Sequence, residues 1–213
     1  MVYSEQENFW LSKFGDKYNN RNKSEILIRN KKIFFKKIFL NLKKNRIGSV
    51  IEFGANVGLN LLGLKKIFKL HKITGVEINK KASLELKKIS NVNVFNGSIR
   101  DFIVKERYDL VLTCGFLIHL KPAYLRSVYK KIYDSCKNEG YILIAEYYNS
   151  SPISITYRGF KNKLFKRDFA GEFISLFKKT RIVDYGFAYH KDKHSQDDLT
   201  WFLIKKNSKA KFR

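Results

Sequence analysis

The hydrophobic and polar positions of the chain follow two alternating periods from residue 48 onward. Short apolar runs typical of buried strands occur at residues 49–53, 73–78, 92–95, 108–113 and 141–146. Between them, apolar side chains recur at helical spacing and predict helices over residues 58–70, 80–89 and 122–136. A repeated order of strand and helix predicts a mostly parallel sheet with helices on both faces.

The alternation changes after residue 149. A segment rich in Tyr, Arg and Lys is predicted to be a loop, followed by a helix near residues 168–177. Residues 182–189 and 199–205 are predicted strands with only the polar segment 190–198 between them. Two consecutive strands without a helix between them form an antiparallel hairpin. The expected fold is therefore α/β and Rossmann-like, with a seven-stranded, mostly parallel sheet and a C-terminal antiparallel hairpin at one edge.

The amino-terminal part is predicted to be helical over residues 5–43, with a loop around residues 15–22. Between residues 31 and 44, lysines surround an apolar stripe at helical spacing formed by Ile33, Phe34, Phe35, Ile38, Phe39 and Leu42. A basic amphipathic helix can lie on a membrane surface. Because a strand follows directly, we expect this helix to cover the sheet instead.

Length and composition place the chain in a broad class. Its 213 residues, 44% of them hydrophobic, suit one domain with a buried core, divided into a helical cover (1–44), a central core (45–147) and a closing part (148–213). No segment has the pattern of a signal peptide or a membrane span. Cys114 and Cys136 are too few for a disulfide framework or a four-ligand zinc site. We expect a cytoplasmic protein without a bound metal.

The net charge of +24 has two interpretations. Lys and Arg neutralise phosphates, so the charge is consistent with a nucleic-acid partner. Alternatively, the lysines reflect a compositional bias, because they are spread from Lys13 to Lys211 and accompany many Ile, Asn, Phe and Tyr residues, as in AT-rich genomes. The charge alone does not decide between them, and the dispersed pattern favours the bias.

The first predicted strand ends in a glycine-containing turn with Glu52, Gly54, Asn56 and Gly58. Glycines after a buried strand let the backbone turn sharply and let a ligand approach the main chain. The spacing E-x-G-x-x-x-G differs from the G-x-G-x-x-G of dinucleotide sites, which aims amides at a pyrophosphate. The turn therefore suits a nucleoside cofactor without a phosphate, such as S-adenosylmethionine. That cofactor has an ammonium group on its amino acid tail, and the carboxylate of Glu52 suits this group.

The ends of the next three strands complete a predicted cofactor cleft. Glu77, followed by Ile78, is placed to accept hydrogen bonds from both ribose hydroxyls. Ser98 and Ile99 offer the adenine a polar group and an apolar surface. Cys114 and Gly115 follow the fourth strand, and ligands in open α/β sheets bind outside the carboxyl ends of strands.

Together, residues 52–58, 77, 98–99 and 108–119 resemble the motif series of class I S-adenosylmethionine-dependent methyltransferases, across about residues 45–147. Residues 9–10, 14–18, 21–22, 145–149, 157–159, 163–172, 184–187 and 197–202 resemble the pseudaminic acid biosynthesis-associated methylases. This resemblance implies S-adenosylmethionine as cofactor, S-adenosylhomocysteine as product and a nonulosonic sugar acid or its precursor as acceptor. Tyr18 and Arg21 are then expected to close over the cofactor. In the position of Ser98, many relatives have Asp.

Methyl transfer to a hydroxyl or amino group needs a proton acceptor near the methyl group. His119 lies after the fourth strand and has a suitable ordinary pKa, although it could instead hydrogen-bond beneath the next helix. Glu146 and Tyr147, at the end of the fifth strand, are further catalytic candidates; packing and an ion pair are their structural alternatives.

A basic cluster is predicted to bind the acceptor, because Arg binds carboxylates and phosphates through two hydrogen bonds. Its alternative is a solvated surface, and Asp168 is placed to cap the next helix. The predicted substrate-binding residues are Tyr148, Arg158, Lys163, Lys166 and Arg167.

Two other functions remain open from the sequence. An RNA methyltransferase would use the basic surface, although the Pro-Pro-Tyr and Pro-Cys motifs of two nucleic-acid methylase classes are missing. A non-catalytic protein of the same fold would bind the cofactor without turnover.

Overall fold

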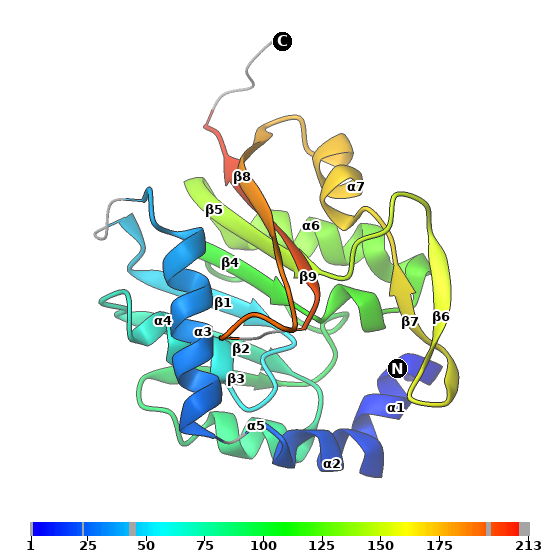
Figure 1. The fold of residues 1–213 in the computed structure, drawn as a ribbon. Coiled ribbons are helices and arrows are strands. Elements are labelled where there is room, and N and C mark those ends of the chain that lie inside the picture. Colours follow the sequence, from blue (N-terminus) through cyan, green and yellow to red (C-terminus); the bar gives the residue numbers. More distant parts are fainter. Residues whose placement is uncertain (1, 23, 43–45, 195–196, 209–213) are drawn as a thin grey trace.

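The computed structural model describes residues 2–22, 24–42, 46–194 and 197–208 (Figure 1). Its centre is a seven-stranded sheet of order β3-β2-β1-β4-β5-β9-β8. Neighbours among β1 to β5 are parallel, whereas β9 runs antiparallel to both β5 and β8. The predicted Rossmann-like fold with its closing hairpin is confirmed. The strands of the sheet are β1 (Ser49–Phe53), β2 (Lys72–Glu77), β3 (Val92–Asn96), β4 (Tyr108–Cys114), β5 (Cys136–Glu146), β8 (Thr180–Ala188) and β9 (Leu199–Lys206).

Helices cover both faces of this sheet. One face packs against α3 (Glu25–Ile38), α4 (Leu59–Lys65) and α5 (Lys80–Leu86). The opposite face packs against α6 (Leu125–Ser135) and α7 (Phe169–Leu176). Phe34, Phe35 and Ile38 of α3 are buried in the core, as predicted from the apolar stripe. No helix among the described residues is long and apolar enough to cross a membrane.

The amino-terminal part differs from the expectation, because residues 15–20 are helical rather than a loop. Helix α1 (Glu5–Leu11) and helix α2 (Lys13–Asn20) are separated at Ser12, whose hydroxyl accepts a hydrogen bond from the Phe14 amide at 3.1 Å. Gly15 lies inside α2 for a packing reason: a Cβ there would lie 2.0 Å from the carbonyl oxygen of Trp10. This glycine marks a close approach of two helices and not a turn.

The segment after β5 also differs from the expectation. In place of a loop it forms an antiparallel hairpin of β6 (Ile153–Tyr157) and β7 (Phe160–Lys166). The two turn residues, Arg158 and Gly159, have φ angles of 50° and 85°, as tight hairpin turns require. Most side chains near the turn are exposed on both faces, so no apolar alternation marked these strands.

Helix α1 lies beside this hairpin, on the side of the sheet where the parallel strands have their carboxyl ends (Figure 1). Gln6 Nε2 donates to the Asn162 carbonyl at 3.1 Å, and the rings of Phe9 and Phe160 lie 5.1 Å apart. Lys163 forms an ion pair with Glu5. We call α1, α2 and the β6–β7 hairpin the cap, because together they cover the carboxyl ends of the parallel strands.

Candidate active site

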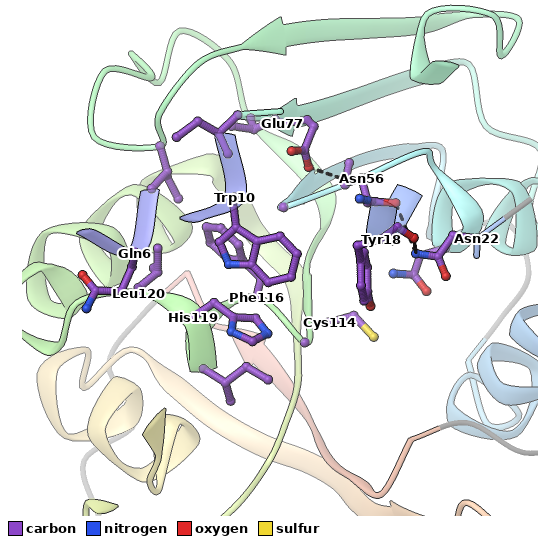
Figure 2. Close-up of a pocket in the computed structure, with 18 of the residues that line it drawn as sticks. Gln6, Trp10, Tyr18, Asn22, Asn56, Glu77, Cys114, Phe116, His119 and Leu120 are labelled. Atoms are coloured by element: carbon purple, nitrogen blue, oxygen red, sulfur yellow. Dashed lines mark hydrogen bonds between the residues drawn. The ribbon is translucent and has the colours of Figure 1, made fainter. Parts of the chain in front are cut away.

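A pocket lies between the cap and the carboxyl ends of the parallel strands (Figure 2). The strand order reverses between β1 and β4, the place where open α/β sheets bind ligands. The register sets Phe53 beside both Val76 and Thr113, so the residues after β1, β2 and β4 meet in one crevice. The residues that line it and lie at or just after strand ends include Gly54, Asn56, Glu77, Ile78, Ser98, Ile99, Cys114, Gly115, Phe116 and Tyr147. Those from helices and other segments include Glu7, Trp10, Tyr18, Lys31, Asn60, His119, Tyr157 and Asp197.

The turn after β1 brings the main chain to the pocket. Gly54 and Asn56 have φ angles of 75° and 46°, and a Cβ on Gly54 would lie 2.3 Å from the Phe116 ring. Both residues line the pocket as predicted. Gly58 does not line it. Its φ of 87° starts α4, and a Cβ there would meet Ile89 at 2.4 Å, so this glycine allows α4 and α5 to pack closely.

Glu77 holds the strand ends together through its carboxylate. It accepts a hydrogen bond from the Asn56 amide on one oxygen and from the Asn79 amide on the other, both at 2.7 Å. Burial raises its pKa to about 6, and these two amide bonds oppose that effect. A carboxylate has about four lone-pair sites, so Glu77 keeps acceptor capacity beyond these amides and lines the pocket.

Glu52 lies behind the pocket wall and does not line it, contrary to its predicted contact with a ligand. The side chain that reaches the pocket is Asn60, whose amide donates to Glu52 Oε1 at 2.6 Å. Neither Glu52 Oε2 nor Asn60 Oδ1, both buried, has a hydrogen-bond partner within the described residues. Burial raises the pKa of Glu52 to about 8, while its bond to Asn60 and the nearby charge of Lys31 lower it. Both oxygens thus lack a partner in the described part of the chain, and the raised pKa leaves Glu52 largely protonated near pH 7.

At the end of β3, Ser98 and Ile99 are both buried and line the pocket with Ile78. The Ser98 hydroxyl donates to Glu7 of α1 and accepts from the Arg100 amide at 3.1 Å. At the end of β4, Cys114 and Gly115 also line the pocket. A Cβ on Gly115 would meet no atom within 4 Å, so this position opens onto free space. Burial raises the pKa of Cys114 to about 11, so it is a neutral thiol.

His119 lines the pocket from the short 3₁₀ turn η2 (Leu117–His119). Its Nδ1 donates to the Lys163 carbonyl at 2.8 Å, which leaves Nε2 as the nitrogen without a proton. Burial lowers its pKa to about 4, and the bond to Lys163 opposes that shift. The imidazole is therefore neutral near pH 7, with Nε2 unprotonated, although the lowered pKa makes it a weaker base than a free histidine.

Glu146 lies beneath this turn and not in the pocket. Its carboxylate accepts hydrogen bonds from the amides of Phe116 (3.2 Å), Leu117 (3.1 Å) and Ile118 (3.4 Å). Burial raises its pKa to about 7, against the lowering effect of those amides. The geometry gives Glu146 a positioning role for the turn that carries His119. Tyr147, the next residue, does line the pocket.

The cap supplies an aromatic wall. The ring centre of Trp10 lies 4.7 Å from that of His119 and 5.3 Å from that of Tyr18 (Figure 2). The ring centres of His119 and Tyr157 lie 4.9 Å apart. Asn56 donates to Asn19 of α2 at 2.6 Å and thereby ties the cap to the β1 turn. Tyr18 lines the pocket as predicted, and burial raises its pKa to about 12. Arg21 does not line it; its guanidinium lies 5.7 Å from the centre of the Tyr18 ring.

The predicted substrate-binding cluster lies outside the pocket. Lys163 pairs with Glu5, and Arg167 pairs with Glu172 at 2.6 Å. Arg158 and Lys166 lie over the rings of Tyr157 and Tyr147. Tyr148 is exposed and packs near Phe202. Asp168 caps α7 by accepting from the Gly171 amide at 2.8 Å. Among the described residues that line the pocket, the single cation is Lys31.

Among the lining residues, Glu7 carries no signal that assigns it a role from sequence. Trp10, Tyr157 and Asp197 stand out only as parts of segments that carry the family resemblance. Asn60, which was also missed, had a usable signal, because it lies in the first turn of the helix that follows the glycine turn. Most of the others come from the cap, whose position over the sheet depends on tertiary packing.

Comparison with known proteins agrees with this geometry. A family model described as a methyltransferase domain matches residues 21–191. No curated protein matches the sequence significantly. A proposed S-adenosylmethionine-dependent methyltransferase from Listeria monocytogenes aligns over 84% of this chain and 99% of its own, with a TM-score of 0.62 and 15% identity.

Two further solved structures share the fold. An S-adenosylmethionine-dependent methyltransferase from Leishmania major aligns over 94% of this chain and 82% of its own, with a TM-score of 0.67 and 15% identity. Coclaurine N-methyltransferase, bound to N-methylheliamine and S-adenosylhomocysteine, aligns over 75% of this chain and 50% of its own, with a TM-score of 0.58 and 15% identity. The chain belongs to the methyltransferase domain family and is an S-adenosylmethionine-dependent methyltransferase.

Proposed function

We propose that the chain transfers the methyl group of S-adenosylmethionine to an amino or hydroxyl group of a small molecule held between the strand ends and the cap. The observation that carries this proposal is one pocket that combines Glu77 and Asn60 on the cofactor side with His119 on the opposite side. The acceptor would lie against the aromatic wall, under the cap.

The residues present fit the cofactor. The free lone pairs of Glu77 suit two ribose hydroxyls. Asn60 Oδ1 and Glu52 Oε2, which lack partners within the described residues, suit a donor such as the ammonium of the methionine tail, with Asn60 in direct contact and Glu52 behind it. Lys31 suits the carboxylate of that tail. The open space beside Gly115 leaves room at the centre of the pocket.

The chemistry that the bound cofactor supplies is an activated methyl group on a sulfonium. Glu77, Asn60 and Lys31 would hold the cofactor, and when bound it would supply this methyl group to the acceptor. His119 Nε2 takes the proton that the acceptor releases, while Nδ1 stays bound to the Lys163 carbonyl. Glu146 holds the turn so that the ring keeps this direction. Positioning of donor and acceptor supplies the larger part of the effect.

The pocket favours an acceptor that is uncharged or carries an amine. The aromatic wall and Asp197 attract cations, whereas the predicted basic cluster is engaged outside. A nonulosonic sugar acid, which the sequence resemblance implies, would have Lys31 as its one lining cation among the described residues, and the cofactor tail competes for it. An amino-sugar precursor without the acid fits the same wall better.

An RNA acceptor is disfavoured by the cap. A flipped base would have to enter beneath α1 and the β6–β7 hairpin, which are bound to each other by the Gln6–Asn162 and Glu5–Lys163 contacts. The dispersed lysines contribute no cation to the pocket other than Lys31 within the described residues.

Isothermal titration with S-adenosylhomocysteine, followed by mass spectrometry of S-adenosylmethionine reactions, tests the proposal. The acceptor panel would contain amino sugars, their N-acetyl derivatives, nonulosonic acids and short RNA. We expect micromolar cofactor binding and a methylated amino or hydroxyl product from the uncharged or amine-bearing compounds. Preference for the acids would contradict the charge argument. Methylation of RNA alone would favour an RNA methyltransferase. Cofactor binding without turnover of any acceptor would favour a non-catalytic protein of the same fold.

A further inference from the structure

Helix α1 places a second carboxylate, Glu7, on the pocket wall beside the end of β3. One carboxylate oxygen of Glu7 accepts a hydrogen bond from the Ser98 hydroxyl and lies 3.2 Å from Arg100 Nε. The other oxygen accepts a hydrogen bond from the Ser4 amide at 2.7 Å. The Glu7 side chain is 8% exposed, and it is among the residues that line the pocket. A buried acid that lines a ligand pocket needs a reason beyond capping a helix of seven residues.

The strand order indicates which part of the cofactor lies here. Going outward from the centre of the sheet, the ends of β1, β2 and β3 follow each other, with Glu77 at the end of β2. If Glu77 binds the ribose, the base lies on the outer side of it, next to Ser98 and Ile99. The edge of adenine carries an exocyclic amine, which donates hydrogen bonds and needs an acceptor there.

Ser98 is poorly placed to be that acceptor. Its one proton is directed at Glu7, and its oxygen already accepts from the Arg100 amide. Glu7 has more acceptor capacity, because a carboxylate has about four lone-pair sites and hydrogen bonds from Ser98 and Ser4 engage two of them. Glu7 is also ionised. Burial raises its pKa, but the hydrogen bonds from Ser98 and Ser4 and the charge of Arg100 outweigh this effect, so the net pKa is below the ordinary value.

We propose that Glu7 accepts a hydrogen bond from the exocyclic amine of the adenine, so that the amino-terminal helix, and not the strand end, selects the base of the cofactor. This inference rests on the cofactor placement proposed above. It gives α1 a specific role, because the cap must be closed for the base to be recognised. Ser98 then acts through Glu7, as a positioning residue for the carboxylate.

The test compares two ligands by isothermal titration: S-adenosylhomocysteine and its analogue in which hydrogen replaces the 6-amino group of the base. The wild-type chain should prefer S-adenosylhomocysteine by roughly tenfold to a hundredfold, the range for a hydrogen bond to a charged acceptor. Glu7→Gln should reduce this preference to about threefold, because a neutral amide oxygen is a weaker acceptor.

Ser4→Ala is the matched control. It removes the cap of α1 but keeps the Glu7 carboxylate, so it should weaken both ligands equally and preserve their ratio. Equal wild-type affinity for the two ligands would overturn the role of Glu7 but leave the proposed cofactor placement standing. A Glu7→Gln variant that weakens both ligands by the same factor would also overturn it, since a structural latch predicts that result. A wild-type chain that binds neither ligand would overturn the cofactor placement as well.

Discussion

The two walls of the pocket are built in different ways. The wall of strand ends holds Glu77 and Gly54 by local chain geometry: a strand stops, a glycine turns, and a neighbouring amide fixes the carboxylate. The cap wall, with Trp10 and Tyr157, depends on contacts between α1 and the β6–β7 hairpin, such as Phe9–Phe160 and Gln6–Asn162, which join segments about 150 residues apart in the sequence. The first wall is suited to a cofactor that every family member shares, and the second to an acceptor that differs among them.

This difference predicts which mutations should impair cofactor binding and which should impair methyl transfer to the acceptor. Changes to the strand-end wall should affect cofactor affinity, whereas changes to the cap and the η2 turn should affect acceptor chemistry. Glu7 is the exception, because it lies on the cap but faces the cofactor side.

The largest expected effect concerns the proton acceptor. In His119→Asn, the side-chain amide can still donate to the Lys163 carbonyl, but the basic Nε2 is lost. With the acceptor found by the panel, we expect kcat to fall by roughly 10²- to 10⁴-fold, the range for general-base catalysis, with unchanged S-adenosylhomocysteine affinity. Stopped-flow or steady-state kinetics and titration measure the two quantities. His190→Asn, at an exposed residue paired with Asp198, should change neither.

If His119→Asn weakened the cofactor as strongly as it slowed turnover, the division between the two walls would be wrong at its central residue. If it changed neither, positioning alone would account for the reaction.

The next effect concerns Glu77. Glu77→Ala removes the two amide contacts and the proposed ribose contacts, so S-adenosylhomocysteine affinity should fall by about a hundredfold or more, given roughly 1.5–3 kcal/mol for each hydrogen bond to a charged group. Titration measures the change. Glu106→Ala is the control, because that acid pairs with Lys72 away from the pocket. Retained affinity in Glu77→Ala would exclude Glu77 from the cofactor site.

A smaller effect should appear as a pH dependence of cofactor affinity. The pKa values of Glu77 (about 6) and Glu52 (about 8) mean that the two acids lose their protons in succession between about pH 5 and 9. Because the ionised forms suit ribose hydroxyls and an ammonium, the S-adenosylhomocysteine affinity should rise about tenfold over this range. In Glu52→Gln the rise should be smaller. A flat profile in the wild-type chain would argue against both contacts.

The cofactor-free chain should show the opposite trend in stability. The folded pKa values of Glu52, Glu77 and Glu146 lie above their ordinary value of 4.5, so the folded state holds more protons and loses stability as pH rises. His119, whose folded pKa of about 4 is below 6.5, gives the reverse effect only below pH 6.5. Thermal unfolding should therefore shift to lower temperature from pH 6.5 to 8, and Glu52→Gln should reduce the shift.

The sequence predicted most of the strand-end wall, because its determinants are local. Gly54, Asn56, Glu77, Ser98 and Cys114 all line the pocket, since a glycine turn or a strand end places them there whatever the rest of the chain does. Glu52 and Gly58 were the exceptions. Gly58 serves the packing of α4 against α5 instead. The Glu52 side chain points elsewhere for another reason. Its position in β1 directs it behind Asn60, and only the packing of α4 decides which of the two reaches the pocket.

The cap could not be predicted in the same way. Gly15 suggested a loop because its contact with Trp10 is invisible in the sequence. The β6–β7 hairpin lacks an apolar face near its turn, although the Arg158–Gly159 pair was an overlooked turn signal. Without that hairpin, the basic cluster was assigned to the substrate, whereas its members bind Glu5, Glu172 and two tyrosine rings.

The smallest expected effect tests the outer boundary of the pocket. Arg158 and Lys166 lie over tyrosine rings and do not line it, and exposed charges contribute little to a buried ligand. The double variant Arg158→Ala, Lys166→Ala should therefore change S-adenosylhomocysteine affinity and turnover by less than about twofold. Lys31→Ala is the informative partner, because Lys31 does line the pocket and should weaken the cofactor by roughly tenfold. If the double variant instead raised the acceptor KM more than Lys31→Ala weakened the cofactor, the acceptor would extend beyond the aromatic wall to the hairpin surface, and an anionic acceptor would again be favoured.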